Sequence, residues 1–324
     1  MPRLPPLARR GLTPADQRLP MAYLVVPSVE DATAIAAIIN ARSLALSGVT
    51  EESASGVARW FALPDLDPAA DMRLAVGPDG AAAGYADVSG PEDGTKKAWV
   101  DLRVRAGHPV AAGLLFAWAQ IRATERVGTG GKIQFFVDES DQPSQARLEA
   151  AGYRAVRASY EMERRLDADL EPPVWPVGLV ARSFDAHDAQ AVHEAHVEAF
   201  ADHWGYTPQS YSGWRALNLS AGGDTSLWRV VWDSADIAGL CINHPHHGED
   251  DTVGWVDVLA VRGPWRRRGV GEALLRESFR LFASRGKQSA GLGVDAENTS
   301  GAVSLYERVG MRVVRRRDTW ERTA

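Results

Sequence analysis

Apolar positions in the second half of the chain switch between the spacing typical of helices and the runs typical of strands. Three- and four-residue spacing predicts helices at 187–201, 271–285 and 300–309, the last closed by Gly310. Apolar runs bounded by turn residues predict strands at 177–183, 252–261, 291–294 and 311–317, and a hairpin at 227–241 that turns at "WDSAD". Helices that alternate with strands indicate an α/β fold, here an α+β mixed sheet with helices crossing between strands.

The same succession of patterns occurs twice along the chain. "AWVDLRV" at 98–104 returns as "GWVDVLAV" at 254–261, and "FFVDESDQPSQARLEAAGYR" at 135–154 returns as "LGVDAENTSGAVSLYERVGMR" at 292–312. Trp99 and Trp255 are 156 residues apart, and Gly152 and Gly310 are 158 apart. Such steady spacing indicates two tandem copies of one unit.

Prolines mark the border between the two copies. "DADLEPPVWPVG" at 167–178 holds three prolines, which neither continue a helix nor pair centrally in a sheet. We therefore expect a first unit at 21–166, a linker at 167–178 and a second unit at 179–324. Residues 1–20 contain prolines and arginines but no apolar core, so we expect a disordered extension rather than a secretory signal.

Composition narrows the class of protein. Among 324 residues, 45% are hydrophobic and 24% charged, which is typical of a folded globular protein. The net charge of −6 argues against a general affinity for nucleic acid, and no apolar run is long enough for a membrane span. Cys241 is the only cysteine, which excludes an intrachain disulfide and favours a cytoplasmic location. Only four of the 36 basic residues are lysine, a bias typical of GC-rich bacterial genomes.

An arginine-rich turn with two glycines, "RRRGVG" at 266–271, separates the predicted strand 252–261 from the next helix. The free amides at a helix N-terminus bind anions, and glycines let a phosphate approach the backbone. The turn therefore predicts a diphosphate cradle, with a solvated basic loop as the alternative. A Rossmann fingerprint is excluded because its third glycine would fall at Leu274, and the Gly-Lys-Ser/Thr of a Walker loop is absent.

The turn matches Arg/Gln-x-x-Gly-x-Gly, the acetyl-CoA pyrophosphate loop of the GNAT N-acetyltransferases. Downstream, "VDAENTSGAVSLYERVGMRVV" resembles the second hallmark of that superfamily, a strand followed by Asn-x-x-(Gly)-Ala-x-x-Leu-Tyr-x-x-x-Gly-Phe/Met. This motif supplies Asn298, Ala302, Leu305, Tyr306, Gly310 and Met311. The tandem layout is similar to that of mycothiol synthase-like double-GNAT proteins. The resemblance implies two tandem GNAT acyl-CoA N-acyltransferase units.

The resemblance also implies roles for residues of the second unit. The backbone N–H of Leu259 would face the thioester oxygen, Val261 would pair with pantetheine, and Asn298 would hydrogen-bond the cofactor. The pyrophosphate would be held by the amides of the loop, which are those of Arg266, Arg267, Arg268, Gly269, Val270 and Gly271. The implied cofactor is acetyl-CoA, and no metal is expected.

Two side chains are candidates for proton transfer. Tyr306 is the expected general acid, because a phenol with a pKa of about 10 matches a coenzyme A thiolate; the alternative is a ring packed on the sheet. Asp257 is the candidate general base. It lies two residues after Trp255, where relatives often carry glutamate, and should project from the same face. The first unit has Asp101 at the matching place, so a purely structural carboxylate is the alternative.

The acceptor site is expected near "EAFADHWGYTP", which brings together Phe200, His203, Trp204 and Tyr206 beside Asp202. Aromatic rings with a carboxylate suit a small amine, and His203 is a second candidate base. A helix end packed on the sheet is the alternative. The His-rich "HPHHGEDD" at 244–251 is interpreted as a solvated turn rather than a metal site, and Cys241 as a small core residue.

The first unit lacks the chemical signature of the second. Its loop, "VRAGHPVAAGLL" at 104–115, is shorter and has no arginine triplet, and Leu148 aligns with Tyr306. We therefore expect a degenerate, non-catalytic unit. The predicted activity is acetyl transfer from acetyl-CoA to a primary amine of a small molecule by direct attack in a ternary complex. The alternative is a tandem GNAT module that binds or senses acyl-CoA without turnover. The sequence does not specify the oligomeric state.

Overall fold

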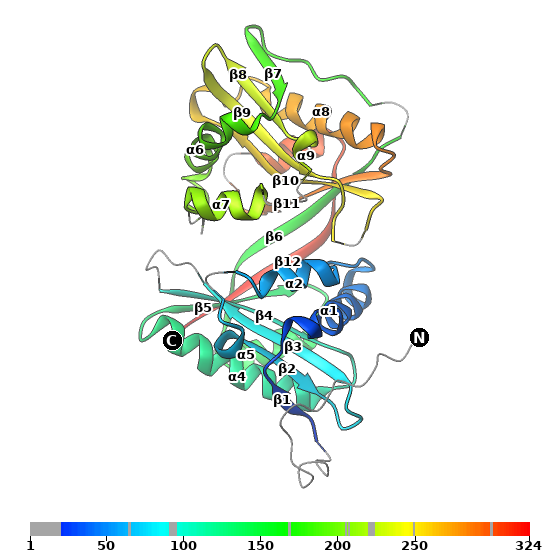
Figure 1. Ribbon diagram of the computed structural model, residues 1–324, viewed down its shortest axis with the longest axis vertical. Helices are drawn as coiled ribbons and strands as arrows, with labels where there is room; N and C mark the ends of the chain where they lie inside the picture. Colours follow the sequence, from blue (N-terminus) through cyan, green and yellow to red (C-terminus); the bar gives the residue numbers. More distant parts are fainter. Residues whose placement is uncertain are drawn as a thin grey trace. The chain divides into compact units, whose positions relative to one another are not determined.

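The computed structural model describes residues 21–63, 66–90, 96–167, 170–204, 206, 208–219, 224–248, 250–298 and 301–324 (Figure 1). The predicted disordered extension at 1–20 lies outside these residues. The described chain forms two compact units, one made of Met1–Arg157 with Arg317–Ala324 and the other of Ala158–Arg316. Each unit is a mixed sheet with helices on both faces.

The first unit follows the order predicted from the repeat. Its elements are β1 (Tyr23–Val25), α1 (Ala32–Ser47), α2 (Ala54–Trp60), α3 (Pro68–Asp71), β2 (Met72–Val76), β3 (Ala82–Ser89), β4 (Lys97–Val104), α4 (Pro109–Val127), β5 (Lys132–Asp138) and α5 (Gln142–Ala150). Strand β6 (Arg154–Arg165) follows. The sheet order in this unit is β1-β2-β3-β4-β5-β12, where β12 (Arg312–Thr323) is the last strand of the chain, and β4 and β5 are parallel.

The second unit repeats this succession. Its elements are β7 (Leu179–Ser183), α6 (Ala189–Phe200), α7 (Tyr211–Asn218), β8 (Arg229–Asp233), β9 (Asp236–His244), β10 (Val253–Val261), α8 (Val270–Ser284), β11 (Ser289–Asp295), α9 (Ala302–Arg308) and β12 (Arg312–Thr323). The sheet order is β6-β11-β10-β9-β8-β7. The mixed α/β fold, the predicted hairpin and the predicted helices are confirmed, whereas α7 was not predicted.

The last strand of each sequence repeat pairs with a strand of the other repeat. β6 pairs with β11, with Arg165 opposite Ser289, and β12 pairs with β5, with Arg317 opposite Asp138. Figure 1 shows β12, the last strand of the chain, beside β5. The compact units therefore divide inside β6 and β12 rather than at the expected linker 167–178. Period-two patterns predict a strand but do not say which neighbour it pairs with.

Helices cover both faces of the sheet of the second unit. Successive side chains along its strands alternate between these two faces. Val231 and Cys241 pack with α8 residues such as Phe279, whereas Val230 and Leu240 pack with residues of α6. Both faces must be apolar where helices cover them, which explains the near-continuous apolar run of β9. This packing fixes α6 and α8 on opposite faces of β10, the strand that precedes the arginine-rich turn.

Candidate active site

The two parallel strands at the centre of the second unit separate halfway along their length. β10 and β11 pair from Val253 opposite Ser289 to Val256 opposite Leu292, and no further. β10 nevertheless continues to Val261, and β11 continues to Asp295 beside β6. The second half of β10 therefore has a free backbone edge on the side where β11 diverges.

The free edge belongs to the residues that the sequence assigned to the cofactor. The Arg262 N–H donates to Ala238 O on β9 at 3.1 Å. Antiparallel pairs alternate between bonded and non-bonded positions, so Ala260 also bonds to β9 while the amides of Leu259 and Val261 point the other way. The N–H groups of Leu259 and Val261 thus face the gap and can pair with an extended ligand, whereas Val261 O on the same edge accepts from Arg266 Nε at 3.0 Å.

The turn after β10 has two left-handed residues separated by one. Arg267 has φ +61° and Gly269 has φ +87°. Left-handed residues in a turn favour a concave arrangement of successive N–H groups, a nest, that binds anions, and the first turn of α8 follows here at Val270. The side chains of Arg267 and Arg268 are exposed. This backbone supports the predicted diphosphate cradle.

The two glycines of the turn differ in role. A Cβ at Gly269 would meet no atom within 4 Å, so glycine there serves the left-handed backbone alone. A Cβ at Gly271 would lie 3.2 Å from Leu305 Cδ2, so glycine there lets α8 approach α9 closely. The helix of the predicted tyrosine motif, which carries Leu305, is therefore packed directly on the start of α8, where the arginine–glycine turn ends.

The structure places Tyr306 on α9, 7% exposed, in the same apolar cluster as Cys241. Burial, together with the nearby Cys241 thiol, raises the pKa of Tyr306 well above its ordinary value, so the phenol stays protonated at neutral pH. A protonated phenol is the form required of a general acid, but the raised pKa also moves Tyr306 away from the match with a coenzyme A thiolate on which the sequence prediction relied. Asn298 lies half-buried after β11, its N–H donating to Asp295 O at 3.1 Å.

Cys241 is a core residue, as predicted. Its Sγ lies 3.2 Å from Asn243 Oδ1 and 3.4 Å from Ser278 Oγ, and burial raises the pKa of the thiol to about 12. A thiol this resistant to ionisation is a poor nucleophile.

Asp257 lies in a β-bulge, which the sequence did not predict. The register between β10 and β9 shifts between Val256 and Val258, so Val256 packs on the α8 side and Val258 on the α6 side. Two-residue spacing from Trp255 therefore does not fix the direction of the carboxylate. Asp257 is 48% exposed and lies 3.8 Å from His244 Nε2.

Three of the four residues predicted to bind the acceptor form one aromatic cluster. The Phe200 ring lies 4.4 Å from the ring of His203 and 5.6 Å from that of Tyr206. Burial, and next the charge of Arg266, lower the pKa of His203. Trp204, also predicted, is 47% exposed.

His196 belongs to this cluster and was missed. Its ring lies 4.9 Å from Phe200 and 6.2 Å from Tyr206. Burial lowers the pKa of His196 to about 4, although the carboxylate of Asp257 opposes that shift. The sequence could have indicated His196 as a member of the cluster, because it precedes Phe200 by one helical turn and so lies on the same helix face.

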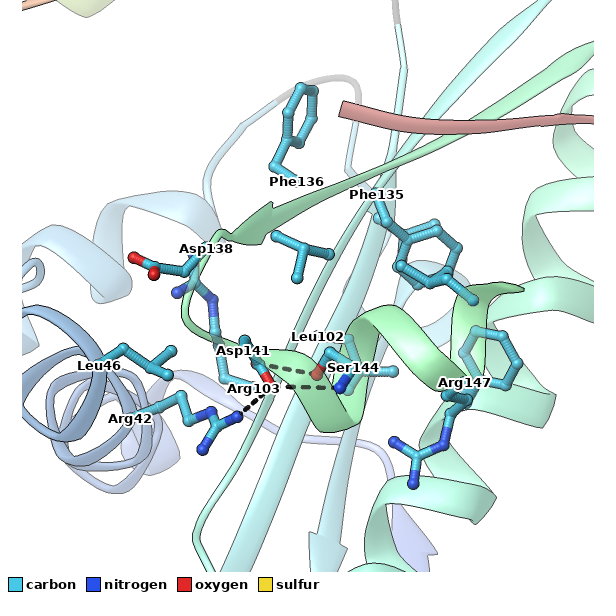
Figure 2. Close-up of a pocket in the computed structure, with 14 residues that line it drawn as sticks. Arg42, Leu46, Leu102, Arg103, Phe135, Phe136, Asp138, Asp141, Ser144 and Arg147 are labelled. Atoms are coloured by element: carbon cyan, nitrogen blue, oxygen red, sulfur yellow. Dashed lines mark hydrogen bonds and ion pairs between the residues drawn. The ribbon is translucent and has the colours of Figure 1, made fainter. Parts of the chain in front are cut away.

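The first unit has the same strand geometry with different chemistry. β4 and β5 also pair over four residues, and a pocket opens beyond, lined by both strands and α5 (Figure 2). Asp141, which aligns with Asn298, bonds there to Ser144, and Arg42 Nη2 lies 2.5 Å from its carboxylate. Figure 2 shows Asp141 between these two partners. The position that aligns with Asn298, a predicted cofactor contact, is thus occupied by an internal ion pair.

The loop and helix of the first unit also depart from the second. α4 begins with Pro109, which has no N–H to offer an anion. Leu148 is buried on α5 and accepts from Tyr153 N–H as Tyr306 accepts from Met311 N–H, which confirms that the two positions correspond. Asp101, aligned with Asp257, is paired with Arg103 at 2.5 Å.

Among the described residues, His, Cys, Asp and Glu side chains do not form groups of three or more that could hold a metal ion. None of the described helices has both the length and the apolar character needed to cross a membrane.

The chain is similar to known acetyltransferases in sequence and in structure. Residues 189–311 match the family model "Acetyltransferase (GNAT) family". A mycothiol acetyltransferase of Salinispora arenicola is 31% identical over 72% of this chain and 75% of its own length. Another mycothiol acetyltransferase, of Thermobispora bispora, is 30% identical over 56% of this chain and 63% of its own.

Solved structures agree over nearly the whole chain. A GCN5-related N-acetyltransferase from Sphaerobacter thermophilus has a TM-score of 0.76 and 31% identity, covering 93% of this chain and 95% of that one. A tandem GNAT protein from the clavulanic acid biosynthesis pathway shares the fold, with a TM-score of 0.67 and 18% identity over 93% and 98% of the two chains. The chain therefore belongs to the GNAT family of acetyltransferases, enzymes that take the acetyl group from acetyl-CoA.

Proposed function

We propose that the second unit transfers an acetyl group from acetyl-CoA to a primary amine of a small molecule by direct attack in a ternary complex. The observation that carries this proposal is the junction of β10, the nest and α9. A strand edge that lacks a neighbouring strand leads to the glycine turn, and Gly271 packs α8 closely on α9, the helix that carries Tyr306. One extended thioester ligand with a diphosphate suits all three features.

Acetyl-CoA supplies a thioester, so the nitrogen–carbon bond forms as the carbon–sulfur bond breaks. The N–H of Leu259 would hold the thioester oxygen, because it lies on the free edge, and Val261 would pair with the pantetheine arm. The amides of 267–271 and the side chains of Arg267 and Arg268 would hold the diphosphate. The amide of Arg266, also expected to do so, donates instead to Gly263 O at 3.2 Å. Asn298 would contribute a further hydrogen bond to the cofactor.

Proton transfer is assigned to one acid and to two candidate bases. Tyr306 would give its proton to the departing sulfur, which suits a buried phenol that remains protonated. Asp257 would accept the amine proton through a water, and His203 is the second candidate for that role. Phe200, Trp204 and Tyr206 would contact the acceptor, with His196 as an added member of the same cluster.

The acceptor is a small amine in this proposal. The similarity to mycothiol acetyltransferases supports a small-molecule acceptor and brings cysteinyl conjugates into consideration. A screen with acetyl-CoA should test amino sugars, cysteinyl conjugates, amino acids and aminoglycosides, with chromatographic detection of coenzyme A and of the acetylated product. Product formation with one class supports the proposal. Tight binding of acetyl-CoA without product from any class would instead indicate a module that senses acyl-CoA.

We also propose that the first unit does not transfer acetyl groups. Support comes from Pro109 at the start of α4, Leu148 in place of the tyrosine and the ion pair at Asp141. Calorimetric titration should then show that each chain binds one molecule of acetyl-CoA. Two equivalent sites would overturn this assignment.

A further inference from the structure

Arg266 differs from its two neighbours in the arginine triplet. Its Nε donates to Val261 O at 3.0 Å, its Nη2 to Ala199 O at 2.9 Å and its Nη1 to Asp202 Oδ2 at 3.2 Å. Its backbone N–H donates to Gly263 O at 3.2 Å. Three of the five guanidinium N–H donors are therefore used inside the protein.

These bonds satisfy two backbone groups that their own elements leave unpaired. Ala199 is in the last turn of α6, where carbonyls have no partner within the helix. A cation there also suits the negative end of the helix dipole. Val261 O lies on the edge of β10 that faces away from β9. Arg266 thus joins the end of β10 to the end of α6.

A second arginine acts beside it. Arg262 Nε donates to Glu198 Oε2 at 2.8 Å, and its Nη1 donates to Ile237 O at 3.0 Å. The C-terminal turn of α6 is thereby held at Glu198 and at Ala199 by the segment that precedes the nest. That turn carries Phe200 and leads directly to His203, two members of the aromatic cluster.

We propose that Arg266 is a positioning residue that couples the acetyl-CoA loop to the acceptor site, rather than a ligand of the diphosphate. The inference rests on the proposed function for the identity of the two sites. Arg267 and Arg268 hold the anion, and Arg266 transmits the conformation of the loop to α6. Binding of acetyl-CoA then steadies the aromatic cluster before the amine arrives.

The test compares Arg266→Gln with Arg268→Gln, a matched change in the same turn. Hydrogen–deuterium exchange at residues 199–204 reports on the end of α6, and calorimetry reports the Kd of acetyl-CoA. In the parent, acetyl-CoA should slow exchange at 199–204. Arg266→Gln should speed exchange there about tenfold and abolish that protection, while its Kd stays within about threefold of the parent.

Arg268→Gln should do the opposite, with a Kd weakened about tenfold and parental exchange at 199–204. With an acceptor from the screen, Arg266→Gln should raise the KM of the amine and leave the KM of acetyl-CoA nearly unchanged. Parental exchange at 199–204 in Arg266→Gln, together with a Kd as weak as that of Arg268→Gln, would overturn the inference.

Two precautions keep the outcomes separate. Exchange in β10 and α8 serves as the folding control, and Arg266→Lys replaces Arg266→Gln if the latter does not fold. Lysine keeps the charge but lacks the planar fork that reaches both carbonyls, so the same pattern is expected. If the parent does not bind acetyl-CoA, the proposed function fails, whereas the exchange of ligand-free Arg266 variants still decides whether the arginine holds α6.

Discussion

Replacement of Gly269 by alanine tests whether the turn before α8 is a preformed diphosphate site. The backbone there has φ +87° and ψ 0°, and an added Cβ would meet no atom within 4 Å. The cost of alanine is therefore conformational rather than steric. Left-handed backbone costs an L residue about 1–2 kcal/mol.

That cost should appear in the affinity for acetyl-CoA. The turn is exposed, so it can relax locally without unfolding the protein, and its amides then no longer converge. Ligand binding must restore the left-handed backbone, which corresponds to a Kd weakened about 5- to 30-fold. The melting temperature should change little.

Calorimetric titration of acetyl-CoA measures this effect against two matched variants. Gly263 lies in the same turn without a left-handed backbone, and its Cβ would also meet nothing within 4 Å, so Gly263→Ala should bind as the parent does. Asparagine tolerates left-handed backbone, so Gly269→Asn should be intermediate. A Kd for Gly269→Ala within twofold of that for Gly263→Ala would refute the reasoning.

Three further predictions concern the acid, the core and the pH dependence of stability. Tyr306→Phe keeps the ring but removes the proton, so kcat should fall about 100-fold or more at an unchanged Kd of acetyl-CoA; an unaltered kcat would remove the general-acid role. Gly254→Ala would place a Cβ 2.3 Å from the Phe282 ring and should lower the free energy of unfolding by about 1–3 kcal/mol in urea. Gly293→Ala, where a Cβ meets nothing within 4 Å, is its control, and equal midpoints for the two would contradict the packing argument. Burial lowers the pKa of His196 from 6.5 to about 4, so between these values the unfolded chain binds more protons and the parent loses stability as the pH falls. His196→Gln should lessen that loss, and identical slopes of unfolding free energy against pH in both proteins would count against it.

Local patterns in the sequence determined much of this protein. The period of apolar residues predicted α6, α8 and the hairpin of β8 and β9, because the positions that face a core repeat with the geometry of each element. The repeat predicted two units of one fold. The glycine turn and the tyrosine motif predicted the family, since both depend on residues close together in the chain.

Tertiary structure alone decided how these pieces meet. Pairing of β12 with β5, and of β6 with β11, depends on contacts between strands far apart in the chain, which period-two patterns do not encode. The bulge at Asp257 follows from a register shift against β9. The arginine triplet looked uniform as a sequence, yet only Arg266 reaches two unpaired carbonyls, because only the folded chain brings the ends of α6 and β10 within the length of one side chain.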